Sequence, residues 1–353
     1  MEKTHLEYSV SDREIRIKHY HYGTVRSILD GDVKQLLQTR IFFSTDFHGS
    51  DQCFLKFINA GKFYKASVII CGGDITGKMI VPLISIPENG YEAEFVGRRQ
   101  IARGENEAAQ LEKSISQVGY YPFRTTKEGF SELNEDRARL DELFSELMVQ
   151  RVRNWIRIAE DKLRDSEIKC IINAGNDDRM EIDDVLESSK VLIHPEGKIV
   201  KVDEKHEMIS TGYTNMTPWN CPRDISEEEL ATRIQDMTSK VSDMQNCIFN
   251  SHCPPFDSAI DAAPKLDKDL KPVVSGGGEI IMVPVGSTAV RAAIEKYQPL
   301  LGLHGHMHES KGSAKVGRTL CVNPGSEYAE GILKGALITI EDGKIKTFQF
   351  TSG

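Results

Sequence analysis

The chain has 353 residues, of which 39% are hydrophobic and 27% are charged, and its formal net charge at pH 7 is -9. This composition is typical of a soluble globular protein of about one or two domains that buries its core without disulfides. The acidic balance, with 53 Asp and Glu against 44 Lys and Arg, disfavours high-affinity binding to nucleic acid.

The sequence has no pattern typical of a secreted or membrane protein. Residues 1–23 lack the apolar core of a signal peptide, and no window approaches the ~20 apolar residues that span a bilayer. The seven cysteines are scattered singly, without a CxxC pair. We therefore expect reduced thiols, a cytoplasmic location and no membrane partner.

Residues 1–39 precede the first predicted strand and are expected to form an extension that packs on the core of a domain spanning 40–353. Within that domain, short apolar runs that end in polar or glycine residues predict buried strands. The runs are residues 40–46, 67–74, 169–176, 246–252 and 300–304, and residues 320–350 add closing strands. Because open α/β sheets place ligand sites at the carboxyl ends of strands, we expect these ends to meet at one rim.

Helical patterns separate these predicted strands. An apolar stripe that begins at Cys53 predicts a helix that Gly61 caps. Ser226 and Glu229 fit a capping box, which predicts the start of a second helix. A third helix is predicted over residues 286–297.

The stretch from about 79 to 166 separates the second and third predicted strands and is expected to be an inserted lid. Turn residues 87–90 between two alternating runs predict a β-hairpin. A long helical pattern follows over about 140–163, in which Met148 and Trp155 are most simply core residues.

Residues able to bind metals gather at the ends of the predicted strands. Taken singly, each group fits an ordinary helix cap or turn, but capping does not explain why all of them follow consecutive strands. Imidazole, carboxylate and amide ligands together suit Mn²⁺, Fe or Zn²⁺, and a carboxylate can bridge two cations. Two cations about 3.5–4 Å apart suit in-line displacement at a phosphate ester.

Five short motifs follow the strands in order: Asp46-x-His48, Gly73-Asp74, Gly175-Asn176-Asp-Asp178, His252 and Gly305-His306-x-His308. This ordered set resembles the calcineurin-like metallophosphoesterase superfamily over roughly residues 40–330. The resemblance implies an α/β fold, a four-layer sandwich of two mixed β-sheets flanked by helices, to which the helical and hairpin insertion is added. It also implies two divalent metal ions (Mn, Fe or Zn). The implied ligands are Asp46, His48 and His308 for one ion, Asn176, His252 and His306 for the other, and Asp74 as the bridge.

One position departs from the family pattern. The third motif normally reads Gly-Asn-His-Asp/Glu, and its histidine protonates the leaving group or steadies the transition state, whereas this chain has Asp177. Two nearby dications would lower the pKa of Asp177, so we expect it to orient water, contact substrate or repel dianionic phosphates rather than donate a proton. The catalytic set implied by the motifs is Asp74, Asn176, Asp177 and Asp178, with the role of Asp178 open because its partner histidine is missing.

Four further features have both a functional and a structural interpretation. Arg179 is either a bidentate phosphate ligand or a solvated charge. Residues 286–288 either bind an anion at a helix start or simply cap that helix. His304 either supports the metal ligands or packs in the core. Residues 211–223 are rich in aromatic, polar and proline residues, which suits a preformed recognition loop more than a flexible linker.

The sequence thus predicts a dinuclear metal-dependent phosphoesterase that hydrolyses phosphodiesters, nucleotides or other small-molecule phosphate esters by metal-bound hydroxide. The alternative is a catalytically weak or inactive sandwich that serves as a binding or scaffold protein, which the missing histidine favours. Retention of all seven presumptive ligands favours the enzyme, because without cations they would form a buried polar cluster with unsatisfied groups.

Overall fold

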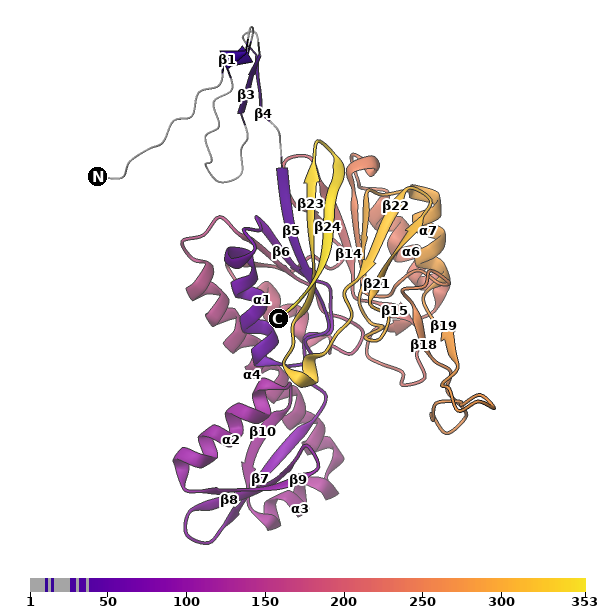
Figure 1. Cartoon of the computed structure of the whole chain (residues 1–353). Helices are drawn as coiled ribbons and strands as arrows, with labels where there is room; N and C mark the ends of the chain where they lie inside the picture. The colour runs from indigo at the N-terminus through magenta and orange to yellow at the C-terminus, as the bar shows by residue number, and fades with distance from the viewer. Residues whose placement is uncertain (1–9, 12–13, 16–25, 30–31, 36–37) are drawn as a thin grey trace, which may run out of the picture.

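The computed structural model describes residues 10–11, 14–15, 26–29, 32–35 and 38–353 (Figure 1). Before residue 38 it defines two short antiparallel pairs: β1 (Val10–Ser11) with β2 (Glu14–Ile15), and β3 (Arg26–Leu29) with β4 (Asp32–Gln35). The predicted packing of residues 1–39 on the core falls almost entirely outside the described residues.

Two six-stranded mixed sheets form the centre of the molecule. The first runs, in spatial order, β12 (Leu192–Ile193), β11 (Lys169–Ile172), β6 (Val68–Cys71), β5 (Gln38–Ser44), β23 (Lys334–Glu341) and β24 (Lys344–Ser352). The second runs β13 (Ile199–Lys201), β14 (Glu207–Thr211), β17 (Ile248–Ser251), β20 (Leu301–Leu303), β22 (Thr319–Asn323) and β21 (Gly312–Val316). The five predicted strand runs are confirmed as β5, β6, β11, β17 and β20.

The two sheets pack face to face through apolar side chains. Ile41 and Ile70 of the first sheet share one buried cluster with Met208 and Leu301 of the second. All four residues of β6 and all four of β17 are buried, because the outer face of each sheet is covered as well. This double burial explains why the strands are continuous apolar runs rather than alternating ones.

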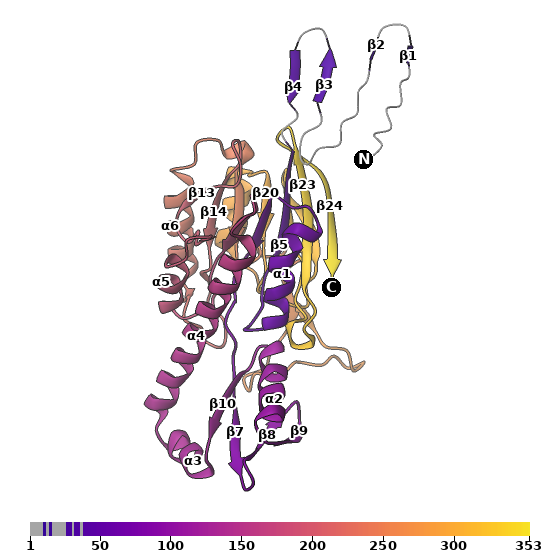
Figure 2. The ribbon, with the colours of Figure 1, turned by 90° about the vertical axis from the view of Figure 1, so that its left-hand side faces the viewer.

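Helices cover both outer faces and complete four layers (Figures 1 and 2). On the first sheet, α1 (Asp51–Phe63), α4 (Arg137–Leu163) and α5 (Glu181–Glu187) contribute to a cluster that includes Phe42 and Ile69. On the second sheet, α6 (Glu227–Thr238) and α7 (Thr288–Tyr297) contribute to a separate apolar cluster with residues of that sheet. The predicted α/β sandwich of two mixed sheets flanked by helices is confirmed.

The predicted helix starts are confirmed, but one predicted helix end is wrong. Ser226 and Glu229 form the capping box of α6, and the Ser287 side chain caps α7. Helix α1, however, continues past Gly61 to Phe63. Gly61 is buried, and a Cβ there would lie 2.9 Å from the Ile168 side chain. The glycine therefore permits close packing of α1 rather than ending it.

Residues 80–135 build a smaller layer that lies below the sandwich in Figures 1 and 2, and α4 runs from this layer up to the outer face of the first sheet. Its sheet runs β10 (Tyr121–Thr125), β7 (Ile80–Ile86), β8 (Gly90–Phe95) and β9 (Arg98–Arg103), with α2 (Glu105–Gln117) and α3 (Lys127–Glu135). The hairpin predicted around residues 87–90 is confirmed as β7 and β8. Val81, Leu83 and Ile115 lie in a separate small apolar cluster, which gives this layer its own core.

The remaining elements are short. They are β15 (Thr214–Asn215), β16 (Asp224–Ile225), β18 (Ala262–Pro264), β19 (Met282–Pro284) and the 3-10 turns η1 (Met244–Asn246) and η2 (Tyr328–Glu330). Strands β18 and β19 pair into a ribbon whose connecting loop projects from the sandwich (Figure 1). No helix in the described residues has both the length and the apolar composition needed to cross a membrane.

Candidate metal centre

The loops that follow the central strands are joined by backbone hydrogen bonds at one rim. The amide of Asp46 donates to the Gly73 carbonyl at 2.9 Å, and the amide of His48 donates to the Asp74 carbonyl at 2.9 Å. Asp46, His48, Asp74 and His306 all have positive φ, from 41° to 67°. Non-glycine residues adopt this region at a cost that the surrounding structure must offset, and such strain is typical of functional sites.

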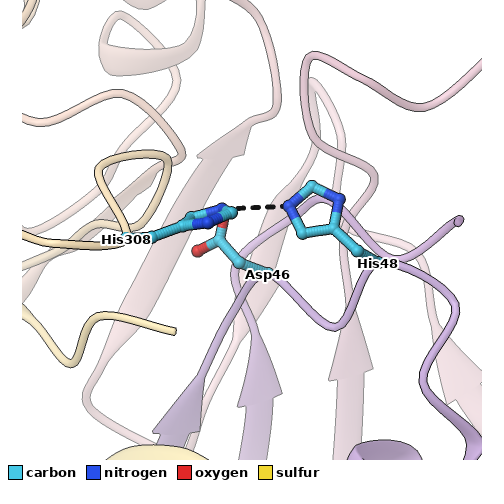
Figure 3. Close-up of side chains that lie close together, drawn as sticks. All are labelled: Asp46, His48 and His308. Carbon is cyan, nitrogen blue, oxygen red and sulfur yellow. Dashed lines mark hydrogen bonds and ion pairs between the residues drawn. The ribbon is translucent and has the colours of Figure 1, made fainter. Parts of the chain in front are cut away.

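The first cluster consists of Asp46, His48 and His308 (Figure 3). One donor atom from each residue lies within 4.8 Å of the other two. The Nε2 atoms of His48 and His308 are 3.0 Å apart, and His308 Nε2 is 3.4 Å from Asp46 Oδ1. Two imidazole lone pairs repel each other at this separation unless a proton or a cation lies between them. The donor set therefore fits a cation.

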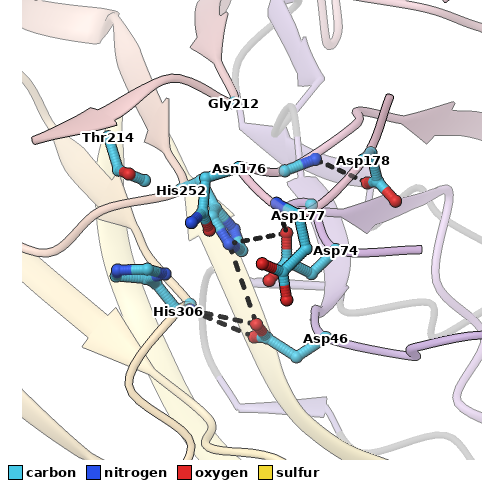
Figure 4. Close-up of polar contacts among 12 residues, drawn as sticks. Asp46, Asp74, Asn176, Asp177, Asp178, Gly212, Thr214, His252 and His306 are labelled. Atoms are coloured by element: carbon cyan, nitrogen blue, oxygen red, sulfur yellow. Dashed lines mark hydrogen bonds and ion pairs between the residues drawn. The ribbon is translucent and has the colours of Figure 1, made fainter. Parts of the chain in front are cut away.

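The second cluster consists of Asp74, His252 and His306, with Asn176 beside it (Figure 4). His252 Nε2 is 3.3 Å from Asp74 Oδ1. The Asn176 amide nitrogen donates to Asp224 at 3.0 Å, which fixes the orientation of the amide and leaves its Oδ1 buried without a hydrogen-bond partner. A buried carbonyl oxygen without a donor requires another electropositive partner, and a divalent cation supplies one.

Asp74 lies between the two clusters. Its Oδ1 faces His252, while its Oδ2 is 3.7 Å from His48 Nε2. Each oxygen of this carboxylate is therefore close to a different cluster. This arrangement fits the predicted bridging role, because a carboxylate placed between two clusters could bind a cation on each side.

Burial and neighbouring charges compete at these side chains. Burial opposes ionisation of Asp46, but the hydrogen bond from His308 and the charge of His252 hold its pKa well below its usual range. Burial raises the pKa of Asp74 despite the opposing charge of His252. His252 is also disfavoured as a cation by burial, yet Asp74 raises its pKa to about 9. Protons on His252 and His308, whose pKa values are both raised, thus balance the buried carboxylates, and bound cations would replace those protons.

Asp177 lies at the edge of the site and is held by several donors. Its carboxylate forms an ion pair with the Lys78 ammonium and accepts a hydrogen bond from Cys221 Sγ at 2.9 Å. Its backbone amide donates to Asp74 Oδ1 at 3.0 Å. Burial opposes its charge, but Lys78 and then His48 hold its pKa at about 2. Asp177 is therefore a carboxylate at neutral pH.

Sequence reasoning missed two residues at this site. Lys78 follows Asp74 by four residues, and its side chain is 48% exposed beside Asp177. Tyr328, in η2, places its ring centroid 4.6 Å from that of His48. A lysine or tyrosine in a polar loop carries no periodic signal, so only the short distance from Lys78 to the second motif could have suggested its role.

Asp178 does not reach the open part of the site. It is fully buried, and its two oxygens accept hydrogen bonds from the amides of Gly175, Ile75 and Thr76 at 2.7–3.0 Å and from the Thr76 hydroxyl. Burial and then the charge of Asp74 raise its pKa to about 6. These contacts join the loop after β11 to the loop that carries Asp74, which makes Asp178 a positioning residue.

Asp178→Asn is expected to destabilise the protein by roughly 2–4 kcal/mol, because either orientation of the amide points its NH₂ at a backbone N–H. Urea denaturation in EDTA measures this loss. The matched control is Asp177→Asn, which breaks an ion pair with a half-exposed lysine and should cost less than about 1 kcal/mol. Equal losses in the two variants would contradict the positioning role.

The other candidate residues have structural partners. The Arg179 guanidinium forms an ion pair with Asp141 on α4. The start of α7 already holds an anion, the carboxylate of Glu227, which accepts from the Ser287 hydroxyl at 2.6 Å. The predicted phosphate roles of Arg179 and residues 286–288 are therefore not supported by these contacts.

His304 supports the segment that carries His252. It is fully buried, and its Nδ1 lies 2.9 Å from the Ser251 carbonyl and 3.1 Å from the Cys253 carbonyl. These two carbonyls flank His252 in the chain. Burial lowers the pKa of His304 to about 4, so at neutral pH the ring is neutral and donates through Nδ1.

A cleft of about 830 Å³ opens beside the two clusters. Its polar end is lined by Asp74, Lys78, Asn176, Asp177, His306 and His308. Of residues 79–166, all of which are described, Phe144 and Met148 of α4 line the cleft. The predicted recognition loop also lines the cleft, through residues between 215 and 221. A further wall is formed by residues between 263 and 285, which the sequence analysis had not assigned to the site.

No protein-family model matches this chain. Over 160 residues it is 32% identical to the uncharacterized protein MJ1162 of Methanocaldococcus jannaschii, a match that covers 45% of this chain. The chain spans 63% of the length of that curated relative.

Comparison with solved structures matches TT1561 of Thermus thermophilus, which is 12% identical and has a TM-score of 0.48 over 89% of this chain and 98% of its own. A novel archaeal phosphodiesterase is 16% identical, with a TM-score of 0.22 over 56% of this chain and 91% of its own. Both TM-scores lie below 0.5, so neither likeness indicates a function for this chain.

Proposed function

We propose that this protein is a phosphoesterase that uses two divalent cations to hydrolyse phosphodiesters or small-molecule phosphate esters. The observation that carries the proposal is the position of Asp74, whose two oxygens face two separate clusters of buried imidazole and carboxylate groups.

Six of the seven free cysteines are buried as thiols, which supports a reducing, cytoplasmic setting.

Each group of the site has a defined task in this proposal. Bound cations would supply Lewis-acid charge to the phosphoryl oxygens and lower the pKa of a water. Their ligands would be Asp46, His48 and His308 for one, Asn176, His252 and His306 for the other, and Asp74 for both. The Lys78 ammonium at the polar end of the cleft would bind a phosphate oxygen, and Asp177 would hold that ammonium in place.

Nitrogen and oxygen donors without thiolate favour Mn²⁺, Fe or Zn²⁺ over softer metals. The proposal is tested by turnover of bis(p-nitrophenyl) phosphate with each of these ions and with EDTA. Turnover that depends on the metal is expected. No turnover with any of the three ions would favour the alternative, a binding protein, for which the ionised Asp177 beside the cleft is the supporting observation.

We also expect a steep dependence of rate on the leaving group. Asp177 has no proton to give at neutral pH, and general acid catalysis is worth about 10²–10⁴ in rate. Aryl methyl phosphates should therefore be hydrolysed far faster than dialkyl phosphates, which a series from p-nitrophenyl to alkyl esters measures. Asp177→His should reduce the difference, and a flat series for the wild type would reveal another proton donor.

A further inference from the structure

The cleft beside the metal centre is polar at one end and apolar along its walls. The polar end has the metal-binding groups and Lys78. The walls come from three segments far apart in the sequence: α4, the loop over 216–219 and the region of β18 and β19. Their main apolar side chains are Phe144, Met148, Met216, Trp219, Leu266 and Leu270.

Several of these side chains are exposed although they are large and apolar. Trp219 is 63% exposed, Met216 is 54% exposed and Leu270 is 47% exposed. Of the fourteen exposed large hydrophobic residues in the described part of the chain, seven lie within 216–219 and 270–282, and three of these seven, Met216, Trp219 and Leu270, line the cleft. Scattered exposed residues need no explanation, but a concentration of them beside a cleft is typical of a binding surface.

The loop that carries Trp219 is fixed relative to the metal centre. Asp224 Oδ2 accepts hydrogen bonds from the backbone amides of Thr217 at 3.0 Å and Cys221 at 2.9 Å. The other oxygen of Asp224 accepts from the Asn176 amide at 3.0 Å. One carboxylate therefore holds both a predicted metal ligand and the loop, so the part of the apolar wall that Met216 and Trp219 form is preorganised at a set position from the metal centre.

We propose that the substrate is a phosphoester of a large apolar alcohol, aromatic or long-chain aliphatic, whose apolar group lies against Trp219, Leu266 and Leu270 while its phosphate lies at the metal centre. This inference rests on the proposed function. A cleft of this volume takes a ligand of the size of a cofactor or drug, and the apolar wall gives binding energy only to a group that it removes from water.

The first test is calorimetric binding of phosphonates, which carry the anionic PO₃ group of a phosphate monoester but are not hydrolysed, to the Mn²⁺-loaded protein. 1-Naphthylphosphonate and octylphosphonate should bind at least about 10-fold more tightly than methylphosphonate. The ratio of the two apolar ligands distinguishes an aromatic from an aliphatic substrate. Octylphosphonate should also shift the emission of the exposed Trp219, since Trp155 is buried against Phe54. Equal affinities for all three phosphonates would overturn the inference.

The second test uses the double variant Leu266→Ser/Leu270→Ser. The preference for the apolar phosphonates should fall about 10-fold, while methylphosphonate binding stays unchanged. Ile101→Ser is the control, because Ile101 is 51% exposed and does not line the cleft. An unchanged preference in the double variant would overturn the inference.

Measurements of ester turnover distinguish failure of this inference from failure of the proposed function. Wild type and the control Ile101→Ser should turn over 1-naphthyl methyl phosphate equally, whereas the double variant should turn it over more slowly. A preference of the wild type for the bulky but polar thymidine 5′-p-nitrophenyl phosphodiester over 1-naphthyl methyl phosphate would overturn the apolar class. If no ester is hydrolysed but the apolar phosphonates still bind preferentially, the esterase proposal fails and the apolar site stands.

Discussion

Replacing Asp74 by asparagine is expected to lower kcat for an aryl phosphodiester by about 10³-fold or more. The carboxylate lies between the two clusters, with one oxygen near His252 and the other near His48. An amide carries no negative charge and has one oxygen donor instead of two, so it binds a pair of cations much more weakly than the carboxylate does. Loss of several kcal/mol of charge stabilisation in the transition state corresponds to a decrease of this size. Steady-state kinetics in excess Mn²⁺ measure the effect.

The same variant should bind fewer metal ions, which elemental analysis after dialysis determines. Its far-ultraviolet circular dichroism should match that of the wild type, because asparagine has nearly the same shape as aspartate. Asp203→Asn is the matched control, since Asp203 contacts His206 and does not line the cleft. Full activity in the Asp74 variant would refute the mechanism based on two cations.

Metal ions are expected to raise Tm by about 5–10 °C relative to EDTA. Without cations, the buried carboxylates of Asp46 and Asp74 depend on protonated histidines for compensation. Ligands that bind only the folded state stabilise it, by about 4 kcal/mol at a free concentration 1,000 times Kd. For a chain somewhat larger than 150–250 residues, each kcal/mol shifts Tm by about 2 °C or slightly less. Scanning calorimetry with Mn²⁺ and with EDTA tests this expectation.

The size of this thermal shift should depend on the integrity of both clusters. His306→Ala removes one predicted ligand from the second cluster and should reduce the shift, whereas Ile101→Ser should retain it. A Tm that Mn²⁺, Fe and Zn²⁺ all leave unchanged would show that the clusters do not bind these ions in the folded protein.

The strands and their rim could be predicted because both depend on local signals. Apolar runs such as residues 67–74 determine the strand, and the polar residues that follow mark its carboxyl end. Parallel pairing of β5, β6 and β11 then brings Asp46, Asp74 and Asn176 together without further information. The strand ends alone predicted that these residues meet at one rim, whereas their division between two ions was implied by the resemblance of the ordered motifs to a known family.

The parts that sequence reasoning missed depend on contacts between distant segments. The Lys78 ion pair with Asp177 joins two loops that are far apart in the chain, and nothing in either loop indicates it. Residues 263–285 contain little periodic pattern, so their position at the cleft followed only from the fold. Gly61 was misinterpreted because a glycine that permits close helix packing and one that ends a helix look the same in sequence.

The loop over 211–223 divides its residues between two separate tasks. Thr214, Thr217 and Cys221 bind Asp224, whereas the side chains of Met216 and Trp219 are largely free in solvent. Mutations at the tip can therefore accumulate without disturbing the anchor or the cation ligands. Natural substitutions, or a saturation library at positions 216 and 219, can therefore change the substrate specificity of the protein while its metal ligands and reaction mechanism stay the same.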